Sequence, residues 1–136
     1  MNAVKTFLFT LLIFGLSLSC TSQTKDDAKT KNSSTEKVEV FYFHYTHRCA
    51  TCTAVESVSK EAVADLYGDK VSFHGFNLDE RDGAAKGKEL EVSGQTLLIV
   101  SGDTKINITN EGFMNARSNP EKLKAIIKEK IDDLID

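Results

Sequence analysis

Residues 38–52 of this chain, VEVFYFHYTHRCATC, contain the stretch that decides its predicted fold. Val38–Tyr45 is β-branched and aromatic almost without interruption, a pattern typical of a central buried strand. Downstream, apolar side chains recur at helical spacing and predict one face of a helix over residues 50–67: Val55, Val58, Ala62 and Leu66. Gly68 then ends that helix. The Cys49-Ala50-Thr51-Cys52 sequence therefore falls at the junction of a strand and a helix.

Beyond this junction the sequence predicts five further elements: a strand over 71–78, a weak helix over 83–91, a buried strand over 96–100, an edge strand over 105–109 and a last helix from Pro120. Asn119 or Ser118 is expected to cap the last helix. Its expected apolar face comprises Leu123, Ile126, Ile127, Leu134 and Ile135. The order β-α-β-α-β-β-α predicts an α/β fold in which helices cover both faces of a mixed central sheet.

Length and composition set limits on the function. The chain has 136 residues, of which 40% are hydrophobic and 27% charged, so one packed domain is expected. Its 17 basic and 20 acidic side chains give a net charge of −3, without the broad positive field that nucleic-acid binding needs. Three cysteines are too few for a small domain held together by disulfides.

The N-terminal segment predicts export. Residues 6–19 are uncharged and largely apolar, follow Lys5, and are too short for a typical bilayer-spanning helix, so residues 1–19 are expected to be a cleaved signal peptide. Ser19 and Cys20 at its end resemble the lipobox of bacterial lipoproteins, although Ser17 stands where leucine is usual. That resemblance implies lipidation of Cys20. The alternative is an ordinary signal peptide with an incidental cysteine.

The remaining chain divides into a tether and a domain. Residues 20–37 hold no large apolar side chain after Cys20 and are expected to form a flexible tether. Residues 38–136 are expected to form the single folded domain. Thr21 and Ser22 follow the cysteine without an aspartate, and in the lipoproteins of enteric bacteria that this segment resembles such a pattern implies the outer membrane, on either its periplasmic or its surface face.

The Cys-x-x-Cys sequence carries the predicted chemistry. At a helix N-terminus the free N–H groups and the helix dipole favour the thiolate of Cys49, and Arg48 adds a positive charge beside it. Cys52 follows one turn later, where it can attack a mixed disulfide on Cys49. The alternative, a disulfide that only stiffens the loop, gains little because the closed loop is so short.

These residues resemble the thioredoxin-like superfamily over essentially all of residues 38–136. The resemblance lies in three segments: the loop Tyr45–Cys52, the strand end Asn77–Glu80 and the segment Val92–Leu97. It implies a thioredoxin-like αβ sandwich, nearest in size to the compact glutaredoxin core. It also implies that the first cysteine attacks substrate disulfides and the second resolves them.

The chain departs from the pattern of that superfamily at several positions. Gln95 stands where the family keeps a cis-proline in its substrate groove, and the one proline of the chain is Pro120. Phe43 occupies the position of the buried aspartate of thioredoxins, so proton transfer to Cys52 needs another carrier. Other replacements fall in the loop itself, where tryptophans and a proline are usual: Tyr45, Arg48 and Thr51.

Histidines near the cysteines leave a second chemistry open. His44 and His47 lie within nine residues of both cysteines, and imidazole with thiolate suits copper or zinc. His47 could instead serve as an acid–base partner near neutral pH, or be an ordinary exposed loop residue. His44 is more simply a hydrogen-bonded histidine at the end of a buried strand.

The sequence thus predicts a thiol–disulfide oxidoreductase anchored by lipid to the bacterial cell envelope, outside the cytoplasm. Such a protein exchanges with thiols and disulfides of envelope proteins and needs a redox partner protein but no bound cofactor. Two alternatives remain open. One is a copper- or zinc-binding lipoprotein that uses Cys49, Cys52, His47 and His44. The other is a thioredoxin-like domain that only binds a partner.

Overall fold

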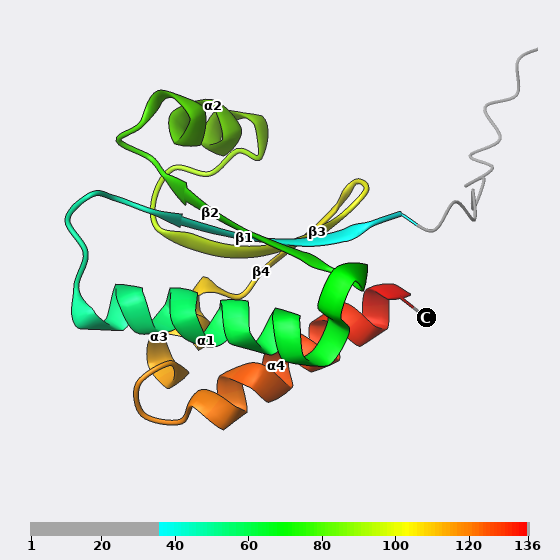
Figure 1. Cartoon of the computed structure of the whole chain (residues 1–136). Helices are drawn as coiled ribbons and strands as arrows, with labels where there is room; N and C mark the ends of the chain where they lie inside the picture. The colour runs from blue at the N-terminus through cyan, green and yellow to red at the C-terminus, as the bar shows by residue number, and fades with distance from the viewer. Residues whose placement is uncertain (1–35, 136) are drawn as a thin grey trace, which may run out of the picture. The chain divides into compact units, whose positions relative to one another are not determined.

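The computed structural model describes residues 36–135. The expected signal peptide, the lipidation site Cys20 and nearly all of the expected tether lie outside the described residues. Within them, no helix is long and apolar enough to cross a bilayer. Figure 1 shows the arrangement of the strands and helices.

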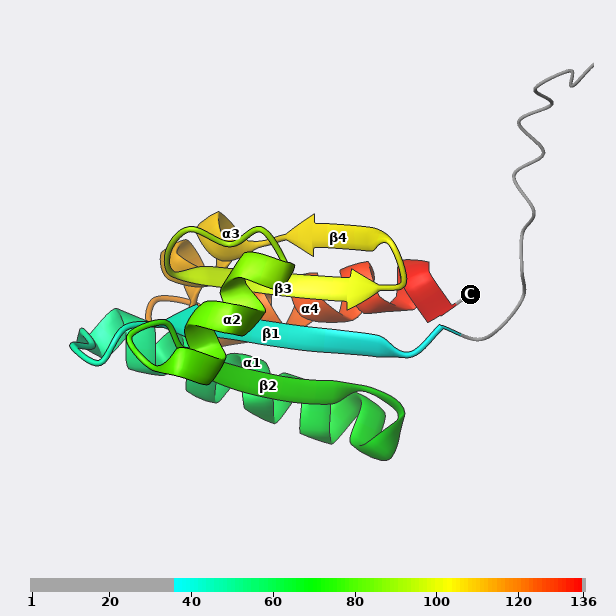
Figure 2. The same ribbon diagram turned by 90° about the horizontal axis from the view of Figure 1, so that it is seen from above.

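A four-stranded mixed sheet forms the centre of the domain. The first strand, β1 (Val38–His44), lies between β2 (Ser72–Asn77), to which it is parallel, and β3 (Thr96–Ser101), to which it is antiparallel. The short strand β4 (Thr104–Asn107) pairs antiparallel with β3, so the order is β2-β1-β3-β4 (Figure 2). The sequence predicted this mixed sheet with its antiparallel edge strand, and the prediction is confirmed.

Helices cover both faces of the sheet, as predicted. Helices α1 (Ala50–Tyr67), α3 (Thr109–Asn115) and α4 (Pro120–Ile135) lie on one face, and α2 (Arg81–Glu89) lies on the other (Figure 1). A single turn of 3₁₀-helix, Gly68–Lys70, follows α1 and leads toward β2. The side chain of Asn119 accepts a hydrogen bond from the N–H of Lys122 at the start of α4, which selects Asn119 rather than Ser118 as the cap.

Helix α3 is the element that the sequence did not predict. It holds only seven residues and contains Gly112, a poor helix former, so its periodicity is weak. The expected edge strand stops at Asn107, whose side chain accepts hydrogen bonds from the N–H and the hydroxyl of Thr109. Gly112 is small enough to let α3 approach Val55 and Leu97, because a Cβ there would lie 3.2–3.3 Å from both side chains.

The core divides at β1 according to the period-two alternation of a strand. Val38, Val40 and Tyr42 face the layer of α1, α3 and α4, while Phe41 and Phe43 belong to the smaller cluster on the α2 side. Helix α4 contributes three fully buried side chains to the larger cluster: Leu123, Ile127 and Ile131. Two residues of the expected apolar faces, Leu66 and Ile135, are instead exposed, and each lies in the last turn of its helix.

Candidate active site

The loop after β1 places Cys49 at the N-terminus of α1. Cys49 is the N-cap residue, with extended backbone angles of φ −85° and ψ 164°, and its Sγ accepts the N–H of Cys52 at 3.2 Å. A sulfur therefore occupies the position that a serine or aspartate oxygen takes in an ordinary N-cap. The free N–H groups of the first helical turn favour negative charge on that sulfur.

The two cysteines differ sharply in their surroundings. Both are free thiols, but Cys49 is exposed and Cys52 is only 3% exposed. The pKa of Cys49 is lowered first by the neighbouring side chain of Cys52, and then by the backbone N–H groups of Cys52 and Thr51. Cys49 is therefore an accessible sulfur that favours the thiolate, and Cys52 is a shielded sulfur one helical turn away. This is the arrangement that thiol–disulfide exchange requires.

Gln95 lies against the buried cysteine. The Cys52 thiol donates a hydrogen bond to Oε1 of Gln95 at 3.4 Å. Gln95 immediately precedes β3, and the pairing of Thr96 with Phe43 brings this end of β3 beside the loop that carries the cysteines. The position that the family resemblance assigned to a cis-proline is thus occupied by a side chain that contacts the second sulfur.

Arg48 lies beside Cys52 and pairs with a carboxylate. Its guanidinium donates to the side chain of Glu56 and contacts the carbonyl oxygen of Cys52 at 3.5 Å. It also lies over the ring of Tyr42, 6.0 Å from the ring centroid. The hydrogen bonds that lower the pKa of Cys49 come from other groups, so a direct effect of Arg48 on that thiolate stays a prediction.

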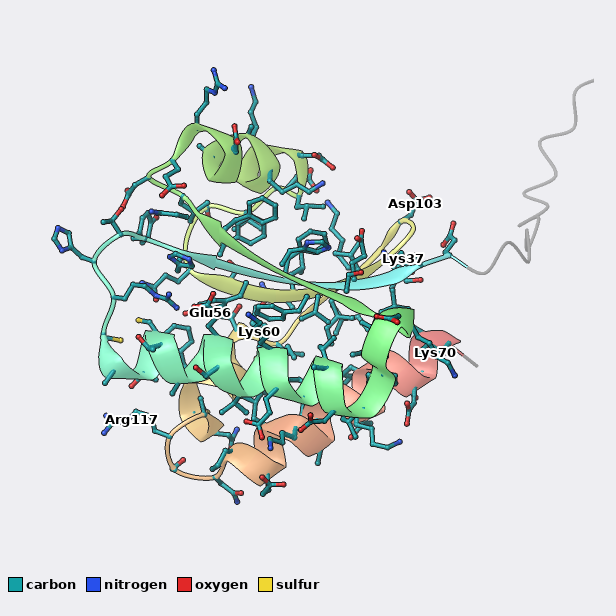
Figure 3. The ribbon with its side chains drawn as sticks, viewed as in Figure 1. Lys37, Glu56, Lys60, Lys70, Asp103 and Arg117 are labelled. Carbon is teal, nitrogen blue, oxygen red and sulfur yellow. The ribbon has the colours of Figure 1, made fainter. Side chains whose placement is uncertain are left out.

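Glu56 and Tyr42 belong to the site but were missed in the sequence. Figure 3 shows Glu56 between α1 and the sheet, and its carboxylate fills the space that a Cβ at Gly75 of β2 would need. Tyr42 is fully buried on β1, and its hydroxyl has no hydrogen-bond partner among residues 36–135. Burial raises the pKa of Tyr42, and the charge of Cys52 raises it further. The sequence could have indicated both residues. Glu56 follows Cys52 by four residues, so it lies on the same side of the helix, and Tyr42 stands between two phenylalanines of the buried strand, so it faces the opposite side of the sheet from them.

The structure does not bring the histidines into a cluster with the thiols. Across residues 36–135, no group of three or more His, Cys, Asp or Glu side chains is arranged to hold a metal ion. His44 is half-buried and its Nδ1 lies 3.0 Å from the carbonyl oxygen of Tyr45, while His47 is exposed on the loop. His74, on β2, pairs with Glu39 of β1 at 3.0 Å.

A small polar network fastens the loop that carries the cysteines. The backbone N–H of Thr46 donates to Asp79 Oδ2 at 2.7 Å, and Asn77 Nδ2 donates to the Thr46 hydroxyl at 3.0 Å. The Thr46 N–H, followed by the Thr46 hydroxyl, lowers the pKa of Asp79. The acidic turn after β2 therefore contributes one carboxylate that holds the loop carrying the cysteines.

Comparison with known proteins rests on structure. No family model and no curated protein matches the sequence. Oxidized thioredoxin O2 from Arabidopsis thaliana matches with a TM-score of 0.51 and 23% identity, covering 69% of this chain and 75% of that chain. The thioredoxin Mala s 13 from Malassezia sympodialis matches with a TM-score of 0.51 and 26% identity over the same shares of both chains.

The described part of this chain therefore has a thioredoxin-like fold, with a four-stranded mixed sheet and four α-helices, and carries a Cys-x-x-Cys pair.

Proposed function

We propose that this chain is a thiol–disulfide oxidoreductase, anchored by lipid on Cys20 to the bacterial cell envelope, that acts on envelope proteins outside the cytoplasm. One observation carries the redox part of the proposal. An exposed thiol with a lowered pKa caps α1 at Cys49, and the buried residue Cys52 lies one turn later and donates its backbone N–H to the Cys49 sulfur.

The exchange follows from this asymmetry between the sulfurs. The Cys49 thiolate attacks a substrate disulfide, a Cys49–substrate disulfide forms, and the first substrate sulfur leaves as a thiolate. Cys52 then loses its proton and attacks the Cys49 sulfur. The Cys49–Cys52 disulfide forms and the second substrate sulfur leaves, so the substrate gains two electrons. A partner dithiol must return those electrons for another cycle, and the reverse sequence oxidises a substrate dithiol.

The anchoring part of the proposal is supported by the sequence alone. An uncharged apolar run over residues 6–19 ends at Ser19-Cys20, and a polar segment without large apolar side chains leads from there to the domain. A Cys20→Ser variant should leave the membrane fraction of cells that express the full chain. If Cys20→Ser stays in the membrane fraction as the natural chain does, the lipid anchor is wrong.

A trapping experiment tests the redox function. In a Cys52→Ser variant the mixed disulfide on Cys49 cannot be resolved, so covalent adducts with envelope proteins should accumulate and disappear on reduction. The matched control is Cys49→Ser, which keeps the buried thiol and should trap nothing. If the two variants give the same adducts, or if Cys52→Ser gives none, thiol exchange through Cys49 is refuted.

A further inference from the structure

The contact between Gln95 and Cys52 has chemical consequences for the second half of the exchange. The Cys52 sulfur lies 3.4 Å from Gln95 Oε1, and the residue is 3% exposed, so protein groups surround most of this side chain. During exchange Cys52 must pass from thiol to thiolate before it attacks Cys49. A thiolate enclosed by protein needs a hydrogen-bond donor from the protein itself.

A glutamine amide can hydrogen-bond to a sulfur in both protonation states. Its oxygen accepts the S–H of a thiol, and its NH₂ group can donate to a thiolate. The terminal torsion of glutamine is soft, so the amide can turn from one orientation to the other. A proline at the same position offers no side-chain hydrogen bond of either kind.

We propose that Gln95 is a catalytic residue that serves Cys52 in both states, an inference that rests on the proposed function. In the dithiol, Gln95 Oε1 accepts a hydrogen bond from the Cys52 thiol, as the structure shows. Once Cys49 is bound in a mixed disulfide, Cys52 releases its proton to water and the Gln95 amide turns to donate to the thiolate. That thiolate attacks the Cys49 sulfur, and the substrate sulfur leaves with the electron pair of the broken S–S bond.

An aromatic disulfide separates the two halves of the reaction. When the reduced protein is mixed with excess dithiobis(nitrobenzoate), Cys49 attacks first and releases one coloured thiolate. Cys52 then attacks Cys49 and releases the second. The first phase reports Cys49 and the second reports Cys52, and both are followed by absorbance over a range of pH in the full chain.

Two variants of Gln95 distinguish the donor role from a merely structural one. Gln95→Met keeps the shape but loses both hydrogen-bonding groups. Its second phase should be about tenfold slower at neutral pH, with the gap closing as the pH rises and the Cys52 thiol ionises in both proteins. Gln95→Glu keeps an acceptor, loses the donor and adds a negative charge, so its second phase should be slower still. The first phase should change little in either variant.

The other titratable and charged groups around Cys52 remain in place in both variants: Cys49, Tyr42, Arg48 and Glu56. Ser93→Ala is the matched control, because Ser93 is an exposed neighbour in the same segment. It should leave both phases unchanged.

Three results would overturn the role of Gln95: an unchanged second phase in Gln95→Met, a faster one in Gln95→Glu, or a slowing that is equal at every pH. The failure of the proposed function looks different. In that case the natural chain itself releases no second thiolate and forms no disulfide between its two cysteines.

Discussion

Tyr42→Phe should stabilise the protein. Tyr42 is fully buried on β1, and its hydroxyl has no hydrogen-bond partner within residues 36–135. An unsatisfied buried polar group costs about 1–3 kcal/mol, which the variant recovers without leaving a cavity because the rings have the same shape. For a domain of about 100 residues, each kcal/mol raises Tm by about 4–8 °C. The expected gain is therefore a Tm higher by about 4 °C or more.

The gain should grow in alkaline solution. Burial raises the pKa of Tyr42 above its ordinary value of 10.0, so the folded protein holds the phenol proton more tightly than the unfolded chain. This contribution to stability is complete below pH 10 and is lost as the pH rises from there toward the raised pKa. The variant has no such loss at this position. The pKa of Tyr67 is also raised by burial, but Tyr67 is present in both proteins, so its effect cancels in the difference between their free energies of unfolding.

Urea unfolding followed by circular dichroism, at neutral pH and above pH 10, measures both effects. Tyr67→Phe is the matched control and should have the opposite sign, because the Tyr67 hydroxyl donates to Asp132 at 2.6 Å. Its loss should cost about 1 kcal/mol. If Tyr42→Phe is instead less stable by 1 kcal/mol or more, the Tyr42 hydroxyl has a partner and the reasoning is wrong.

Three other changes test the site and the loop. Cys52→Ala removes the largest cause of the lowered pKa of Cys49, so the alkylation rate of Cys49 should rise at higher pH than in the natural chain. Gly83→Ala should destabilise the fold by about 1–3 kcal/mol in urea, because the new Cβ would lie 1.9 Å from the carbonyl oxygen of Asn77. Asp79→Ala should speed deuterium exchange at the loop N–H that this carboxylate binds. Because the pKa of Asp79 lies below its ordinary value of 3.8, the protection of this N–H, relative to an unstructured amide at the same pH, should fall as the pH drops from there through the lowered pKa.

The glycine and aspartate changes each have a matched control. Gly94→Ala should leave stability nearly unchanged, because the nearest atom to its Cβ is the Tyr45 hydroxyl at 4.0 Å. Asp82→Ala removes an exposed carboxylate three residues after Asp79 and should not alter exchange at Thr46. If Gly83→Ala is as stable as Gly94→Ala, or if both aspartate variants exchange alike, the packing or the loop network is misassigned.

The fold was predictable where a pattern is local and regular. The continuous β-branched and aromatic run of Val38–Tyr45 and the helical spacing after Cys49 identified β1 and α1 nearly to the residue. Hydrophobic periodicity carries this information because one face of each element is buried. The sequence did not predict helix α3, because this helix is short and contains Gly112. It forms where packing against α1 and β3 compensates for its weak helix propensity.

The candidate site divides in the same way. By itself, the sequence determined that two cysteines stand one helical turn apart at a strand–helix junction, because spacing and helix geometry are local properties. Only the tertiary structure decided what surrounds the second sulfur. Gln95 reaches Cys52 across 43 positions of sequence, and Arg48 turns to Glu56, because strand pairing and helix packing bring these groups together. Such contacts depend on the whole fold, so no periodic pattern in the sequence predicts them.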